Sequence, residues 1–87
     1  MKAEILSIGS ELTSGQNLDT NGQWLSLRLE EIGIPVGWHT TIADDMEDNV
    51  AAFRLATERA GLVLANLPPA FIWRYVKRGG AGDGVVA

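Results

Sequence analysis

Three segments of strand length, separated by two segments of helical length, constrain the fold of this chain more than any other feature. They occupy residues 2–8, 35–42 and 61–66. The first and third contain short apolar runs typical of buried strands, and the second is rich in β-branched and aromatic residues with alternating polarity. Residues 20–33 and 45–60 repeat apolar side chains at helical spacing. This alternation with short connections predicts an open α/β fold whose parallel strands lie in the order 2-1-3, with residues 2–8 at the centre.

Residues that favour helix ends flank both predicted helices. Thr20 begins a capping-box pattern, although Asp19 could cap the first helix equally well. The acids at 44–48 are explained by capping and by the helix dipole at the start of the second helix, so we infer no metal cluster there.

The polar loop that follows the first strand is the candidate ligand site. It leaves the carboxyl end of a central parallel strand, which is where open α/β sheets bind ligands. Gly9 allows close approach of the backbone, Ser10 can donate a hydrogen bond, and the next helix offers N–H groups to an anion. Glu11 and Asp19 could hold a divalent cation that bridges to phosphate oxygens.

The same residue types also have structural explanations. Asp19 could serve only as a helix cap and Asn21 only as a first-turn residue, since both types prefer those positions without a ligand. Glu11 could be an ordinary solvated carboxylate. His39 has no other histidine to pair with, so we interpret it as structural.

Three motifs occur in an order that is more specific than any one of them. They are Ile5-Leu6-Ser7-Ile8-Gly9-Ser10-Glu11-Leu12 with Gly15, Asp19-Thr20-Asn21 with Trp24-Leu25, and Gly33 followed by Thr40-Thr41 and the acidic helix start. Together they resemble the N-terminal domain of the competence/damage-inducible protein A (CinA) family, which shares its three-layer fold with molybdopterin-binding domains of molybdenum-cofactor biosynthesis. The resemblance assigns ligand or phosphate binding to Gly9, Ser10, Glu11, Gly15, Asp19 and Asn21, and metal binding to Glu11 and Asp19.

The second ligand loop of that family has no counterpart in the sequence. In the family a loop of the form Thr-Gly-Gly-Leu-Gly-Pro-Thr, with two aspartates shortly after it, follows the third strand. This chain reads Ala65-Asn66-Leu67-Pro68-Pro69-Ala70 instead. We therefore expect residues 1–66 to be the N-terminal part of an incomplete domain, and residues 67–87 to be a divergent, poorly ordered tail.

Composition and charge narrow the possible partners. A formal net charge of −4 argues against a nucleic-acid or anionic-membrane surface. The absence of cysteine excludes disulfides, thiolate metal sites and a cysteine nucleophile. No apolar run approaches the roughly 18 residues that a membrane-spanning helix needs, and we expect a cytoplasmic protein.

The resemblance implies a nucleotide, or a molybdopterin-like pterin phosphate, as the ligand. It also implies hydrolysis of the pyrophosphate of ADP-ribose with Mg, Mn or Co, but no catalytic residue can be assigned. Because the second loop is missing, we expect the chain alone to be inactive. The competing hypothesis is an inactive fragment that serves as an interaction or structural module, or that results from a disrupted reading frame. Whether a second copy completes the sheet is left open.

Overall fold

The computed structural model describes the backbone of residues 1–67, 71–78 and 83–86, and the side chains of residues 1–67. Within these residues the elements follow one another as β1 (Ala3–Ile8), α1 (Ser10–Thr13), α2 (Thr20–Glu31), β2 (Val36–Ile42), α3 (Met46–Arg59), β3 (Leu62–Leu67), β4 (Phe71–Arg78) and β5 (Asp83–Val86). No helix of the described part is long and apolar enough to cross a bilayer.

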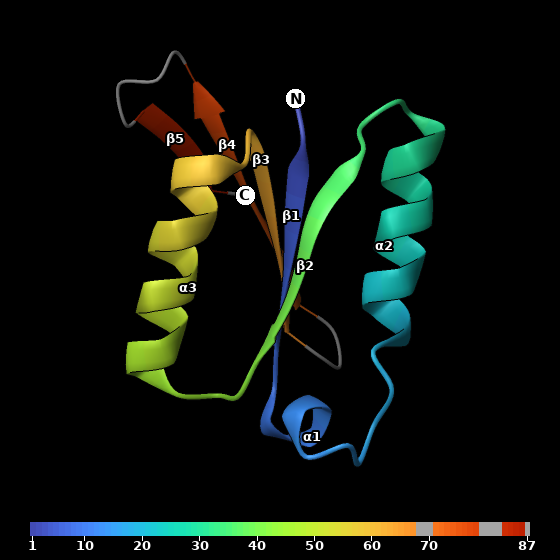
Figure 1. Cartoon of the computed structure of the whole chain (residues 1–87), viewed down its shortest axis with the longest axis vertical. Helices are drawn as coiled ribbons and strands as arrows, with labels where there is room; N and C mark the ends of the chain where they lie inside the picture. The colour runs from blue at the N-terminus through green and yellow to red at the C-terminus, as the bar shows by residue number, and fades with distance from the viewer. Residues whose placement is uncertain (68–70, 79–82, 87) are drawn as a thin grey trace.

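The strands form a single sheet with β1 inside it. Their order is β2-β1-β3-β4-β5, and β1 pairs in parallel with both β2 and β3. Helix α2 covers one face and α3 the other, which gives three layers (Figure 1). The predicted α/β class and the parallel order 2-1-3 are therefore confirmed.

Two antiparallel strands continue the sheet beyond β3. β4 pairs with β3, and β5 pairs with β4. The sequence left residues 71–76 open between a strand and a helical turn and did not identify β5, because a short hairpin lacks the strand-to-helix alternation of the preceding chain. How well ordered residues 67–87 are stays a prediction, and the glycine-rich residues 79–82 lie outside the described residues.

Apolar side chains on the two faces of the sheet form two cores. On the α2 face the buried cluster is Ala3, Ile5, Leu25, Leu29, Leu62 and Leu64. On the α3 face it is Leu6, Ala56, Ala60 and Val63, with Trp38, Ala52 and Phe53 packed against it. Because successive side chains of a strand point to opposite faces, every second residue of β1 and of β3 lies on the same face of the sheet.

The row on the α2 face becomes polar where the strands end. Ile5 and Leu64 are paired across β1 and β3, and the next pair in the row is Ser7 and Asn66. Both polar side chains are buried. Buried polar groups need hydrogen-bond partners, and the start of α2 supplies one, as described below.

A buried ion pair ties the α3 face together. The Glu4 side chain is 1% exposed, and its Oε1 accepts from Arg59 Nε at 2.7 Å while its Oε2 accepts from Arg59 Nη2 at 2.9 Å. The Thr40 hydroxyl also donates to Glu4 Oε2 at 2.8 Å. The guanidinium carbon of Arg59 lies 4.7 Å from the centre of the Trp38 ring. The last turn of α3 is thereby joined to β1 and β2.

Candidate ligand site

The candidate loop begins where β1 ends, at the carboxyl edge of the parallel strands (Figure 1). The sequence predicted irregular structure from residue 9 to residue 19, but Ser10–Thr13 form the single helical turn α1. Four residues are too few for an apolar period to reveal a helix. Gly15 has φ of 81°, a left-handed conformation that favours glycine, so its role in the structure is to shape the loop.

A hollow of about 350 Å³ opens beside this loop. Its lining residues are Leu12, Gln16, Asn17, Leu18, Asp19, Thr20 and Asn21. The volume lies near the lower end of the range of about 300–1,000 Å³ for small-molecule sites. Of the six predicted ligand residues, the hollow brings together Asp19 and Asn21.

The other four predicted residues lie outside this lining: Gly9, Ser10 and Glu11 at the start of the loop, and Gly15 in its middle. The Gly9 N–H donates to Ile42 O at 2.9 Å, and the Ser10 hydroxyl accepts from the Asp44 N–H at 3.4 Å. The Glu11 carboxylate lies over Gly9, where a Cβ would be 2.6 Å from Glu11 Oε1. The first turn of α1 has no side-chain cap.

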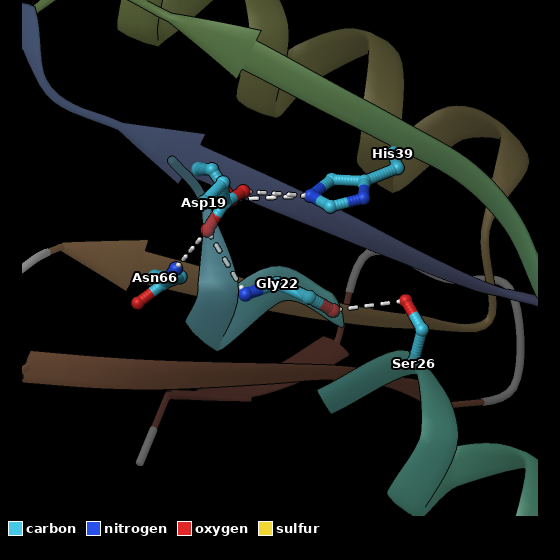
Figure 2. A network of polar contacts seen from close by, with 6 residues as sticks. Asp19, Gly22, Ser26, His39 and Asn66 are labelled. Atoms are coloured by element: carbon cyan, nitrogen blue, oxygen red, sulfur yellow. Dashed lines mark hydrogen bonds and ion pairs between the residues drawn. The ribbon is translucent and has the colours of Figure 1, made fainter. Parts of the chain in front are cut away.

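Asp19 lies at the centre of a polar network that joins three strands to α2 (Figure 2). It caps α2, because the Gly22 N–H donates to its Oδ1 at 2.9 Å. Asn66 Nδ2 donates to the same oxygen at 3.1 Å, and His39 Nε2 lies 2.9 Å from Oδ2. The Ser7 hydroxyl oxygen lies 3.2 Å from the same His39 nitrogen. We call Ser7, Asp19, His39 and Asn66 the Asp19 clamp.

The contacts of His39 fix its protonation pattern. A carboxylate can only accept, so the Nε2 atom that faces Asp19 carries a proton. Ser7 and Asp19 both approach this one nitrogen. A Ser-His-Asp relay uses the two ring nitrogens separately. Within the clamp, His39 therefore acts as a donor that holds Asp19, and Ser7 is not an activated nucleophile.

The N-terminus of α2, which the sequence suggested as an anion site, is already capped by the Asp19 carboxylate. The pKa of Asp19 is lower than its ordinary value of 3.8. Burial raises this pKa, but hydrogen bonds from Ser7, the Gly22 amide and His39 lower it by more. The capping alternative for Asp19 is realised in the structure.

This lowered pKa predicts a pH-dependent part of the stability. A carboxylate whose pKa is lower in the folded state stabilises the fold above its unfolded pKa, and this contribution is lost as pH falls through the folded value. The gap in free energy of unfolding between wild type and Asp19→Asn should therefore narrow as pH falls from neutral to below 3.8. Urea unfolding at both pH values measures it. A gap that stays constant would contradict the ionised clamp.

The close approach of α2 to the clamp predicts the effect of Gly22→Ala. A Cβ at residue 22 would lie 2.5 Å from Asp19 Oδ2 and from His39 Nε2, and neither group can move without lengthening a clamp hydrogen bond. Although alanine is favoured over glycine in a helix by about 1 kcal/mol, we expect a net loss of about 1–3 kcal/mol from overpacking. Thermal unfolding tests it, with exposed Gln23→Ala as the matched control; equal stability of the two variants would contradict the contact.

The described residues do not provide a ready site for a divalent cation. No group of three or more His, Cys, Asp or Glu side chains with suitable placement occurs in residues 1–67, 71–78 and 83–86. Asp19 already accepts hydrogen bonds at both oxygens. A cation bound to Asp19 would compete with these hydrogen-bond donors, and we derive no chemical step through a metal.

Comparison with known proteins gives the family context of this loop. A family model described as "Probable molybdopterin binding domain" matches residues 4–66, which include β1 except Ala3, the loop and the whole clamp. A CinA-like protein from Dictyoglomus thermophilum is 49% identical over 65 residues, which cover 75% of this chain and 16% of that protein. A CinA-like protein from Anaeromyxobacter dehalogenans is 47% identical over 64 residues, with coverages of 74% and 16%.

A solved structure shows the same fold. The crystal structure of the protein CinA, of unknown function, from Thermoplasma acidophilum superposes with a TM-score of 0.71 at 28% identity, covering 74% of this chain and 38% of that chain. The chain spans about 16% of the length of the two CinA-like relatives.

Proposed function

The chain belongs to the probable molybdopterin binding domain family, and on this premise we propose that it binds a phosphate-bearing nucleotide or pterin at the loop after β1. The observation that carries the proposal is the hollow lined by residues 16–21 at the carboxyl end of the inner parallel strand. This position is the one at which open α/β sheets bind ligands.

The lining suits a ligand with an aromatic ring and a polar group. Leu12 and Leu18 provide apolar surface, and Leu18 is 86% exposed at the rim, where a ring could cover it. Gln16, Asn17 and Asn21 add side-chain amides that can donate to phosphate or ring oxygens. At the start of the loop, the Ser10 hydroxyl accepts from the Asp44 N–H and can itself donate to the ligand.

We propose binding without turnover for the isolated chain. Metal-dependent hydrolysis of ADP-ribose is what the CinA resemblance implies, but Ala65–Ala70 lack the glycines and aspartates of the second loop. A cation such as Mg, Mn or Co enters the proposal as a companion of the ligand's phosphates, with Glu11 as the loop carboxylate that could meet it. A cytoplasmic location stays a prediction from the sequence.

A second candidate function is an interaction module that binds no small ligand. The observation that favours it is the outward side of α2, where Trp24 is 55% exposed and Leu27 is 53% exposed. A protein partner could cover such a surface. The hollow does not depend on these residues, so the two functions are separable by mutation.

Calorimetric titration with ADP-ribose, AMP and inorganic pyrophosphate tests the proposed binding. We expect saturable binding of ADP-ribose that Asn21→Ala weakens between about twofold and tenfold, the range for one hydrogen bond. Gln23→Ala, also in the first turns of α2 but outside the lining, is the control and should bind as wild type. If the folded wild-type chain binds none of these ligands, the proposed ligand binding is wrong and the interaction module becomes the favoured function.

A further inference from the structure

We propose that Asp19 is a positioning residue of the ligand loop, held in place by His39 and Asn66, and that it binds neither the phosphate of the ligand nor its cation. The inference rests on the proposed function and deepens it, because it divides the loop into residues that contact the ligand and a residue that orients them. It also gives His39 and Asn66, which no sequence motif marks, a defined part in the site.

The first argument is that Asp19 has its acceptors already in use. Oδ1 accepts from Gly22 and Asn66, and Oδ2 faces His39 Nε2 at 2.9 Å. The side chain is 17% exposed. A phosphate would be repelled by this carboxylate, and a cation would have to compete with the three donors that already hold its two oxygens.

The second argument comes from Asn66. Its Oδ1 is buried and makes no hydrogen bond, although its Nδ2 holds Asp19. An apolar residue in this row, such as Leu64 one step earlier, would leave no unpaired oxygen. The contact with Asp19 therefore explains why an amide occupies this buried position at the end of β3.

The third argument is the place of Asp19 in the chain. The two residues after it, Thr20 and Asn21, line the hollow and begin α2. His39 comes from β2 and Asn66 from β3, the two strands that flank β1. The clamp thus fixes the direction in which Thr20 and Asn21 enter the hollow, and it makes their placement depend on both flanking strands.

Asp19→Asn and Asp19→Ala separate positioning from direct binding. Asparagine is as good a helix cap as aspartate, and its amide can pair with His39 if the neutral ring exchanges its proton between nitrogens. We expect metal-free pyrophosphate affinity of Asp19→Asn within about threefold of wild type, and a loss of about tenfold or more in Asp19→Ala, which removes several hydrogen bonds at once. Equal losses in the two variants would overturn the inference.

A second arm tests the cation. If Asp19 only positions the loop, Mg²⁺ should change the pyrophosphate affinity of wild type and of Asp19→Asn by the same factor. A Mg²⁺ effect that is present in wild type and lost in Asp19→Asn would identify Asp19 as a metal ligand and overturn the inference.

Rescue at His39 tests whether it acts through Asp19. His39→Gln keeps an N–H donor and should retain affinity, whereas His39→Leu should lose affinity but less than Asp19→Ala, because it removes one of the three hydrogen bonds to the carboxylate. The double variant Asp19→Ala/His39→Leu should lose no more than Asp19→Ala alone, since the contact between the two residues is already broken in Asp19→Ala. Additive losses would show that His39 acts independently and would overturn its assigned role.

Hydrogen exchange in the ligand-free chain keeps the test independent of binding. If wild type binds neither ADP-ribose nor pyrophosphate, the proposed function fails and the ligand part of the inference fails with it. The clamp itself is then tested by the hydrogen-exchange protection of the Gly22 amide, which donates to Asp19. This protection should fall in Asn66→Ala and in His39→Leu, in samples whose circular dichroism matches wild type, and it should persist in His39→Gln. Unchanged protection in all three would overturn the clamp.

Discussion

Purified chain incubated with ADP-ribose and Mg²⁺, Mn²⁺ or Co²⁺ is expected to release AMP far more slowly than about 1 s⁻¹, the lower end of typical enzyme turnover. A pyrophosphate held between two loops divides its contacts between them. After β3 this chain continues with Leu67-Pro68-Pro69, without the glycine amides and aspartates of the second loop. Of the two ligand loops of the family, the first is the one whose motif this sequence contains.

The size of the expected deficit follows from the lost contacts. Each hydrogen bond to a charged group contributes about 1.5–3 kcal/mol, so losing two or three weakens binding by several orders of magnitude. The Asp19 clamp lowers the number of carboxylates that could fix a cation, and in-line attack needs the reacting groups held in place. Weaker ligand binding and a less well fixed cation both lower the expected rate of hydrolysis.

The measurement is AMP release by the purified chain, followed beside a Glu11→Ala variant. Background release at the same low rate in both samples is the expected result. Turnover of about 1 s⁻¹ or more that disappears in Glu11→Ala would show that the first loop alone suffices for catalysis.

Arg59→Met should destabilise the fold strongly through Glu4. The Glu4 carboxylate is 1% exposed, and the variant leaves it with the Thr40 hydroxyl as its remaining partner. Removing one partner of such a pair is destabilising because the remaining buried charge is left uncompensated. Because the Arg59 side chain is 29% exposed, water screens part of the pair, and we expect a loss of stability larger than that of an exposed substitution but smaller than that of a fully buried pair.

Two further variants make this result specific. Arg54→Met changes an exposed arginine of the same helix and should alter stability by less than about 0.5 kcal/mol. Glu4→Met/Arg59→Met removes both charges and should recover much of the loss, since an apolar pair leaves no buried carboxylate. Thermal and urea unfolding compare the three. Equal stability of Arg59→Met and Arg54→Met would mean that Glu4 does not depend on its partner.

The sequence predicted the parallel part of the fold because its signals are local. Apolar runs of strand length, helix stop residues and right-handed crossovers are all read within about 40 residues of chain, the length of a βαβ unit with its flanks. The family match over residues 4–66 and the similarity to CinA-like proteins confirm the resemblance that the loop motifs indicated. The antiparallel strands β4 and β5 were not predicted, because a hairpin that follows a proline pair lacks the alternation of strand and helix on which the prediction of the other strands rested.

The Asp19 clamp could not be predicted because its members are distant in sequence. His39 is 20 residues from Asp19 and 32 from Ser7, and Asn66 is 47 residues from Asp19. The sequence does contain one signal. Two residues after the apolar Ile5 and Leu64, both strands carry a polar residue, Ser7 and Asn66, at the carboxyl edge of the sheet. Such a change predicts that a polar partner lies above the strand ends, but not which one.

The most direct test of ligand binding at the loop after β1 is a titration of ¹⁵N-labelled chain with ADP-ribose, followed by amide chemical shifts. We predict saturable shifts concentrated at residues 16–21, which line the hollow, with smaller shifts at Ser10 and Glu11 and none on the outward side of α2. Shifts that fail to saturate, or that gather around Trp24 and Leu27 instead, would contradict the proposed site.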